Sequence, residues 1–450
     1  MSVSDHTAHR LLARLAHAQS SGKLPSVVAG LVRDGAPVWF GSYGSPAVPG
    51  HDARDVQYRI GSITKTMTAV LALQLERDGR LSLDDPVSKV LGDLGGNGYA
   101  DRTARTLLAH SSGMQSEPAG SWWERSAGLS FDELLALNDG TRGVFGAGER
   151  FHYSNLGYAL LGEVVARLLG TTWWEAVRER VLAPLGMSRT SYLPEGAAAQ
   201  GRSVHPYDGT LVAEPATDTG AMAPAGQVWA TIEDLATYAV FLGQGHPDVL
   251  SVEELDRAYG PQAGSQEDGL RSQHGLGFQL FAGGSGMLAG HTGSMPGFLA
   301  TVLVDRPRRT GGAVLANATT GYSPAAIVTE LLEELERCEP TIAEPWRPTA
   351  AVPDALAGVP GVWHWGNTAI VLAMEGSDLV ARRNGVELYR FRVTGEGRVI
   401  GRSGYHAGEE MRVVRRADGS VHYLEVATFI YTRTPYDPTA PIPGGVPAEG

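Results

Sequence analysis

The sequence predicts an α+β fold followed by a smaller antiparallel β domain, and three features indicate this division. Short apolar strands lie near both ends of residues 1–340, and helices lie between them, which is typical of an antiparallel sheet with a helical insertion. Residues 341–356 form a proline-rich linker with little apolar periodicity. Residues 357–450 then carry short, regularly spaced strands, as in an antiparallel barrel or sandwich.

Apolar periodicity places the elements of the first region. We expect helices over 7–20, 62–77, 155–169, 173–181, 231–242 and 324–337, and strands over 27–33, 37–41, 299–304 and 313–317. The pair Asp34-Gly35 between the first two strands is a hairpin signal. The helix over 62–77 is apolar around most of its circumference, so we expect it to lie deep inside the domain.

The second region shows the alternation and turn residues of strands. We expect strands over 369–375, 378–383, 387–393, 411–415, 421–427 and 429–434, separated by turns such as Glu375-Gly376 and Asp418-Gly419. The tail over 435–450 is rich in proline and glycine, and we expect it to be irregular.

Composition excludes several classes of function. The net charge of −12, without any Lys/Arg run, argues against nucleic acid as a partner. No apolar stretch approaches 18 residues, so no membrane partner is expected, and residues 1–20 lack the apolar core of a secretory signal. We therefore expect a cytoplasmic protein. The single cysteine, Cys338, excludes an intramolecular disulfide.

The segment Ser62-Ile63-Thr64-Lys65 is the first candidate for chemistry. At the start of a helix, residues three apart share a face, so the hydroxyl and the amine can meet. A serine hydroxyl needs a nearby base, and a buried lysine can serve because its pKa falls. The chain has only three lysines, and arginine cannot replace lysine as a base. A surface lysine on a helix is the alternative, which the apolar surroundings disfavour.

Two further segments are ambiguous when each is taken alone. Tyr153-Ser154-Asn155 precedes a helix and is compatible with a loop tyrosine and a capping asparagine. His291-Thr292-Gly293-Ser294 precedes the strand over 299–304 and is compatible with a simple turn. Glycine at 293 also permits a substrate backbone to come close.

Together, the order S-x-x-K, Y-x-N and H-T-G resembles that of the penicillin-recognising serine enzymes. The similarity is greatest to the branch with class C β-lactamases, D-alanyl-D-alanine carboxypeptidases, D-aminopeptidases and related esterases. The segments 107–114 (LLAHSSGM) and 224–226 (PAG) agree with that branch. The resemblance covers about residues 7–338 and implies a β-lactamase/transpeptidase-like fold without metal or cofactor.

The resemblance also implies a role for each residue. Ser62 is acylated, Lys65 takes its proton directly or through Tyr153, Asn155 orients Lys65 and the substrate amide, and His291 assists Tyr153. The backbone N–H groups of Ser62 and Ser294 form the oxyanion hole. Thr292, Gly293 and Trp229 are expected to contact the substrate.

The histidine at 291 narrows the expected activity. β-Lactamases of this branch resemble K-T-G, whereas H-T-G is similar to peptidases, aminopeptidases and acyl transferases, and a neutral histidine anchors a substrate carboxylate less strongly than lysine does. We expect a penicillin-binding-protein-type thioesterase that releases and cyclises a nonribosomal peptidyl thioester with a D-configured C-terminal residue. The thioester is either free or bound to a carrier protein. The alternatives are a D-stereospecific aminopeptidase, amidase or carboxylesterase, and a sensor that is acylated without turnover.

The second region resembles a lipocalin-like β domain, on the segment 361–367 (GVWHWGN). It is either a bystander or a roof over the site that shapes the substrate or excludes water. The sequence leaves the oligomeric state open.

Overall fold

The computed structural model describes residues 2–436, apart from residues 46, 95, 266–268, 285, 320, 322, 343, 344 and 350. The chain divides into two compact units, Met1–Thr341 and Ile342–Gly450. The tail that the sequence predicts to be irregular lies, from residue 437 onward, outside the described residues.

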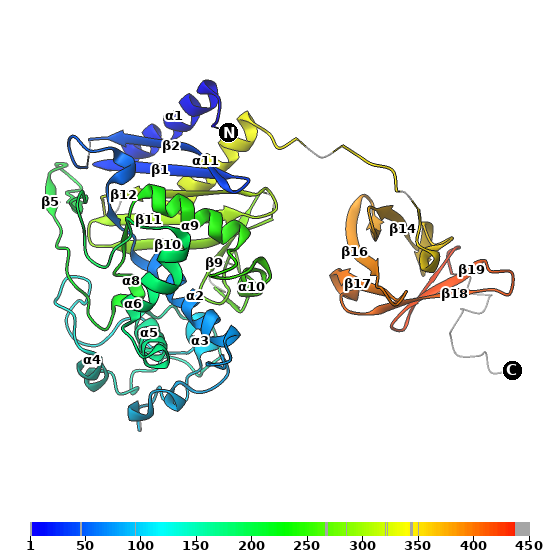
Figure 1. The fold of residues 1–450 in the computed structure, drawn as a ribbon, viewed down its shortest axis with the longest axis horizontal. Helices are drawn as coiled ribbons and strands as arrows, with labels where there is room; N and C mark the ends of the chain where they lie inside the picture. Colours follow the sequence, from blue (N-terminus) through cyan, green and yellow to red (C-terminus); the bar gives the residue numbers. More distant parts are fainter. Residues whose placement is uncertain are drawn as a thin grey trace. The chain divides into compact units, whose positions relative to one another are not determined.

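An antiparallel sheet of eight strands is the frame of the first unit (Figure 1). Its order is β2-β1-β12-β11-β10-β9-β8-β7, so strands from the two ends of the unit lie side by side. The strands are β1 (Ser26–Arg33), β2 (Ala36–Gly44), β7 (Ala263–Gly264), β8 (Ser272–His274), β9 (Gln279–Gly283), β10 (Gly286–Met295), β11 (Phe298–Asp305) and β12 (Thr310–Ala316). The predicted sheet with a helical insertion is therefore confirmed.

Helices cover both faces of this sheet. Val27 of β1 packs in a cluster with α1 (Asp5–Gly22) and α11 (Pro324–Cys338). Its neighbour Val28 belongs to the larger core that includes α9 (Ile232–Gln244) on the opposite face. Successive strand residues point to opposite faces, so a strand that is covered on both sides is apolar at nearly every position. This explains the continuous apolar runs of the central strands.

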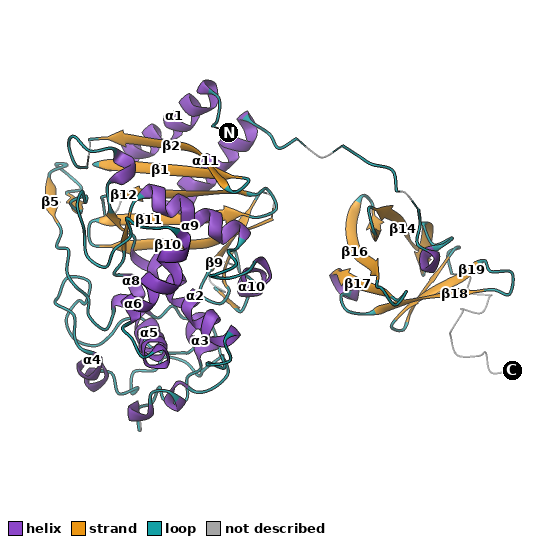
Figure 2. Cartoon of the chain, in the orientation of Figure 1, coloured by secondary structure: helices purple, strands orange, loops and turns teal. Residues whose placement is uncertain are grey.

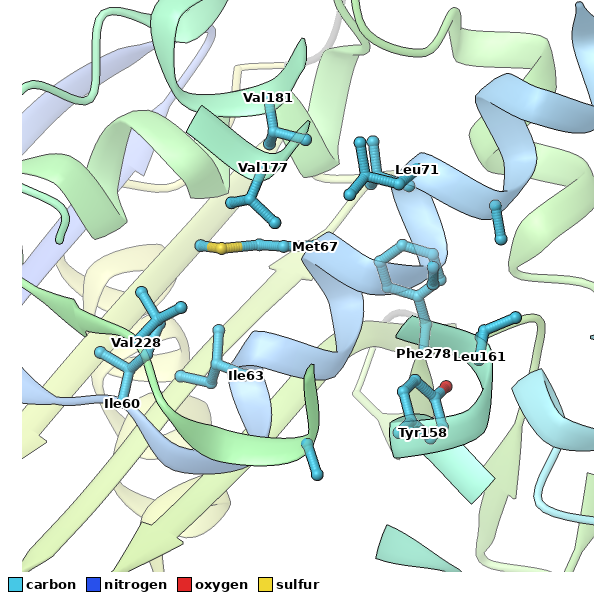
Figure 3. Packing of buried hydrophobic residues seen from close by; sticks show 14 of the residues in the cluster. Ile60, Ile63, Met67, Leu71, Tyr158, Leu161, Val177, Val181, Val228 and Phe278 are labelled. Atoms are coloured by element: carbon cyan, nitrogen blue, oxygen red, sulfur yellow. The ribbon is translucent and has the colours of Figure 1, made fainter. Parts of the chain in front are cut away.

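Helix α2 (Thr64–Arg77) runs through the middle of the helical region. Every residue from Thr64 to Leu75 is buried, as the sequence predicts. Figure 3 shows Met67 and Leu71 of α2 packed beside Val177 and Val181. The other helices are α3 (Ala104–Leu108), α4 (Phe131–Leu137), α5 (Asn155–Leu169), α6 (Trp173–Val177), α7 (Ala183–Leu185), α8 (Ala223–Gly226) and α10 (Val252–Ala258). Burial on all sides fixes the start of α2 relative to its neighbours.

Two short ribbons complete this unit. β3 (Tyr58–Arg59) pairs with β6 (Trp229–Ala230) directly before α2, and β4 (Arg202–Val204) pairs with β5 (Leu211–Ala213). The first ribbon ties the chain leading into α2 to the segment that follows α8.

Three local predictions differ from the structure. Ser62 lies in a 3-10 turn, Gly61–Ile63, rather than in the α-helix itself. The helix expected over 173–181 is α6 continued by a π-helical turn, Arg178–Leu182. The segment His291–Ser294 does precede the strand over 299–304, but it lies inside a strand of its own, β10, rather than in a turn. Glycines at 290 and 293 interrupt the apolar alternation there, which hides the strand from pattern analysis.

The second unit is a closed antiparallel barrel of eight strands (Figure 2). They are β13 (Gly361–Trp365), β14 (Thr368–Glu375), β15 (Asp378–Arg383), β16 (Val386–Val393), β17 (Val399–Ser403), β18 (Glu410–Arg415), β19 (Val421–Val426) and β20 (Phe429–Thr432). The predicted antiparallel barrel is confirmed, although the sequence does not predict β13 and β17. Pairing of His364 with Thr432 closes the barrel.

The interior of the barrel is filled with side chains. Trp363, Phe391 and Leu424 are buried at its centre. A cavity of only about 10 Å³ lies among them, which is close to the minimum for one water molecule. A small-molecule ligand has no room inside this barrel.

No helix among the described residues is both long and apolar enough to cross a bilayer.

Candidate active site

Ser62 and Lys65 meet at the start of α2. The Lys65 Nζ donates hydrogen bonds to the Ser62 Oγ over 2.9 Å and to the carbonyl oxygen of Ala225 over 2.6 Å. The 3-10 turn runs directly into α2, so side chains three residues apart lie on one face. Ala225 belongs to α8, which therefore holds the amine in place opposite the hydroxyl.

Burial changes the acidity of Lys65. Its side chain is 0% exposed. Desolvation lowers its pKa from 10.5 to about 7, and the carboxylates of Glu117 and Glu124 act in the opposite direction. A large share of the amine is therefore unprotonated at neutral pH and able to accept a proton.

The phenol of Tyr153 lies beside this pair. Its ring centroid is 5.1 Å from the Lys65 Nζ. Burial raises the pKa of Tyr153 above its ordinary value, and a side-chain hydrogen bond with Ser62 opposes that effect only in part. The hydroxyl is therefore protonated at neutral pH and can pass a proton on.

Three buried histidines surround the phenol. His110 stacks on the Tyr153 ring at a centroid distance of 4.0 Å. His274 of β8 lies 5.0 Å from His110 and 6.1 Å from His291 of β10. Burial lowers the pKa of all three imidazoles, that of His274 to about 3. They are neutral at pH 7, so this wall of the site carries no cation.

Strand β10 passes against the turn that carries Ser62. A Cβ atom on Gly293 would lie 1.9 Å from the carbonyl oxygen of Ile60 and 3.1 Å from the backbone nitrogen of Ser62. A Cβ atom on Gly61, whose φ is +54°, would lie 2.6 Å from the backbone nitrogen of Ser294. Only glycine permits both approaches. The two backbone N–H groups that the resemblance assigns to an oxyanion hole are therefore brought into neighbouring positions.

The rest of the H-T-G segment is fixed along β10. The ring of His291 makes its hydrogen bond through Nδ1 to the carbonyl oxygen of Thr292. The backbone N–H and the hydroxyl of Thr292 both donate to Gln279 on β9, over 2.8 and 2.9 Å. Both side chains are thus held by their own sheet.

Asn155 begins α5 and joins a different partner from the expected one. Its Nδ2 donates to the Oε1 of Glu117 over 2.7 Å. Among the described residues, the Lys65 amine donates to Ser62 and Ala225 and not to Asn155. Glu117, which lies in the loop between α3 and α4, therefore contacts the predicted site through Asn155.

The structure does not bring Trp229 into this group. Its side chain is 2% exposed and packs edge-on against Phe298 at a centroid distance of 5.1 Å. Strand β6 directs this ring into the core, and the contact with substrate stays a prediction.

Three further groups lie at the site, and the sequence patterns do not mark two of them. Glu117 and His274 carry no motif that distinguishes them from ordinary loop and strand residues. The carbonyl of Ala225 falls inside the PAG segment, so the resemblance could have indicated it.

Residues 11–336 match the protein family described as Beta-lactamase. The chain belongs to the beta-lactamase family. The enzymes of this family are serine hydrolases, in agreement with a serine and a lysine at the start of a buried helix. A second family, a domain of unknown function (DUF7586), matches residues 352–433, which contain the barrel.

The curated relatives match only part of this chain, and the match covers only part of each relative's own length. "Beta-lactamase-like protein 2" of Dictyostelium discoideum is 27% identical over 337 residues, which are 69% of this chain and 59% of the relative. "Protein flp" of Staphylococcus aureus is 25% identical over 283 residues, 60% of this chain and 55% of the relative. The chain thus spans little more than half the length of these relatives.

Solved structures of the beta-lactamase fold are similar over longer stretches. A D-stereospecific amidohydrolase from Streptomyces is 28% identical, with a TM-score of 0.61 over 74% of this chain and 99% of the other. SurE is 23% identical, with a TM-score of 0.60 over 95% of this chain and 99% of the other. The penicillin-binding protein homologue of Pyrococcus abyssi has a TM-score of 0.65 at 22% identity, over 96% of this chain and 100% of the other. The last two likenesses show the fold alone.

One large cavity lies apart from the candidate residues. Its volume is about 880 Å³, and its walls include Trp173, Trp174, Tyr192 and Pro224. None of Ser62, Lys65 and Tyr153 lines it. In the described part of the chain, no group of three His, Cys, Asp or Glu side chains is arranged to hold a metal ion.

Proposed function

We propose that this protein is a serine acyltransferase that forms an acyl-enzyme on Ser62 from a peptidyl thioester with a D-configured C-terminal residue. The observation that carries the proposal is the 2.9 Å contact between the Ser62 hydroxyl and the wholly buried Lys65 amine. A buried amine of lowered pKa beside a serine is the arrangement that nucleophilic catalysis needs at neutral pH.

In the acylation step, the Ser62 Oγ attacks the carbonyl carbon and its proton passes to the Lys65 Nζ. The carbon–sulfur bond then breaks, and the proton passes through the Tyr153 hydroxyl to the leaving thiolate. The N–H groups of Ser62 and Ser294 stabilise the negative oxygen of the tetrahedral intermediate.

In the release step, the peptide's own amine attacks the acyl carbon. The carbon–oxygen bond to Ser62 breaks, the proton lost by the amine passes by way of Lys65 or Tyr153 to the Ser62 Oγ, and a cyclic peptide leaves. A neutral wall of three imidazoles suits this step, because it does not repel an approaching amine as a lysine in place of His291 would. The similarity to a D-stereospecific amidohydrolase at 28% identity supports a D-configured residue, and the donor could arrive on a carrier protein.

A second candidate is a D-stereospecific amidohydrolase, in which water replaces the amine. The relative from Streptomyces at 28% identity favours it. The two functions share the acyl-enzyme and differ only in the acceptor.

A linear peptidyl thioester mimic ending in a D-residue tests the proposal. We expect cyclic product by mass spectrometry, and a Ser62 adduct when turnover is trapped by acid. Linear product alone would establish the hydrolase, and an adduct without turnover would establish a sensor. Full activity of a folded Ser62→Ala variant would overturn the mechanism itself.

A further inference from the structure

We propose that Glu117 is a positioning residue that fixes the amide orientation of Asn155 and provides the counter-charge of Lys65. This inference rests on the proposed acyl-enzyme function. It assigns to the site a specificity for donors with an amide N–H next to the reacting carbonyl.

Glu117 is held at both oxygens. Its Oε1 accepts from the Nδ2 of Asn155, and its Oε2 accepts from the Nε1 of Trp123, each over 2.7 Å. Its own carbonyl oxygen accepts from Gln115 over 2.8 Å, and the backbone N–H of Asn155 donates to Ser116 over 2.8 Å. The segment 115–117 is therefore joined to the first turn of α5, and the carboxylate has little freedom to turn away.

The chemistry of a carboxylate decides which end of the Asn155 amide faces it. A carboxylate only accepts hydrogen bonds, whereas an asparagine amide has one donating and one accepting end. The Nδ2 must therefore face Glu117, and the Oδ1 points to the other side of the planar group. An acceptor is thus left for a donor in the site, which is either a substrate N–H or the charged form of Lys65.

The same carboxylate is the main anion acting on Lys65. Of the charged groups, Glu117 has the largest effect on the amine, followed by Glu124, and both favour its protonated form. The other ionisable groups around the amine are the three neutral histidines and the buried phenols: His110, His274, His291, Tyr153 and Tyr158. Glu117 therefore opposes, in part, the effect of desolvation on the base.

The matched variants Glu117→Gln and Glu124→Gln test both roles of Glu117, the orientation of the Asn155 amide and the counter-charge to Lys65. Each removes one negative charge, but only Glu117 bonds Asn155, since Glu124 accepts from Trp122 over 2.8 Å. The probes are the nitrophenyl ester of N-acetyl-D-leucine and its analogue with an ester oxygen in place of the amide N–H. The readouts are kcat/KM against pH and the ratio of the two substrates.

For E117Q we expect the acid limb of kcat/KM to move down by about 0.5–1 pH unit. Glutamine can face Asn155 with either end, so we expect the preference for the amide-bearing donor to fall by about 3- to 10-fold. E124Q is expected to shift the limb less and to keep the ratio. E117D keeps the carboxylate, so we expect it to return the acid limb to its original pH and to restore part of the preference for the amide-bearing substrate. If E117Q does not fold, E117D and E117N give the same comparison.

An unchanged ratio and limb in E117Q, or equal loss of the ratio in E124Q, overturns the inference. Trapping of the Ser62 adduct in the parent protein distinguishes failure of the proposed function from failure of the role assigned to Glu117. If the parent forms no adduct, the proposed function fails, whereas an adduct with an unaltered E117Q overturns only the role of Glu117.

Discussion

At the scale of the residue, Lys65 is the side chain with the fewest acceptable substitutes. It is wholly buried, and it contacts a hydroxyl and a carbonyl through one nitrogen. Arginine keeps its proton in proteins and has a broader head group. Hydrophobic substitutes would fill the space but would leave Ser62 without a base.

The first prediction concerns pH. The lysine pKa of about 7 lies far below its ordinary value, and the base works only when it is unprotonated. We therefore expect kcat/KM for an activated ester to rise with pH through about 7 and then to level off. Lys65→Arg should lose about 10²- to 10⁴-fold over this whole range, since the guanidinium stays protonated.

Stopped-flow release of nitrophenol measures this profile between about pH 5 and about pH 9, a range wide enough to contain the whole titration of such a base. An acid limb near the ordinary pKa of lysine, or an active Lys65→Arg protein, contradicts the assignment of the base.

The second prediction concerns the close approach of β10 to the Ser62 turn. Gly293→Ala would place a Cβ atom 1.9 Å from the Ile60 carbonyl oxygen, so the strand must move away. We expect unfolding stability to fall by about 1–3 kcal/mol or more, and acylation to fall by a larger factor than stability alone explains.

Gly92→Ala is the control, because a Cβ atom at that position would have nothing within 4 Å. Urea unfolding and acylation kinetics are measured for both variants. A fully active Gly293→Ala protein contradicts the proposed oxyanion hole.

At the scale of the element, α8 connects the base to the helical core. Its Ala225 carbonyl accepts from Lys65, and its Pro224 carbonyl accepts from Thr68 over 3.0 Å. On its other side, α8 packs against Gly162 of α5, where a Cβ atom would lie 2.1 Å from the Pro224 ring. We therefore expect a small displacement of α5 to shift α8, whose Ala225 carbonyl holds the amine.

The third prediction compares two helical glycines. Gly162→Ala should lower stability by about 1–3 kcal/mol and move the acid limb of the pH profile, because α8 shifts. Gly243→Ala, in α9 with open space around it, should raise stability by about 0.5–1 kcal/mol and leave the profile unchanged. Thermal unfolding and kcat/KM against pH check both, and equal behaviour of the pair contradicts the role of this contact.

The sequence alone predicts the serine–lysine pair and the buried helix α2, but it does not predict the contacts that form only by tertiary packing. Ser62 and Lys65 follow from helical spacing and the scarcity of lysine, and α2 from its apolar residues. The close contact of Gly293 with Ile60 is long-range, so the sequence indicates only that a side chain is missing. Glu117 and His274 reach Lys65 through tertiary packing, and no local pattern sets them apart.

At the scale of the whole molecule, the two units have separate cores. The barrel core around Trp363 is a distinct cluster from those of the first unit. Separate cores allow separate unfolding transitions in one chain. The interior of the barrel is filled by its own side chains and leaves a cavity of only about 10 Å³ where a lipocalin-like fold suggests a ligand cup.

The fourth prediction follows from these cores. Trp363→Ala in the full chain should lower one calorimetric transition by the equivalent of about 3–5 kcal/mol and leave the other in place. Leu331→Ala, in the cluster beneath α11, should affect only the other transition. A single transition that moves as a whole in both variants contradicts independent folding.

The first unit also begins and ends at one place. The backbone N–H of Ser4 donates to the side chain of Glu339 over 2.7 Å, and the buried Glu334 of α11 pairs with Arg10 and Arg14 of α1. The first and last segments of this unit therefore lie side by side. A domain of this kind can be spliced into another polypeptide, or reopened at a different loop with its old ends joined, without drawing any strand out of the sheet.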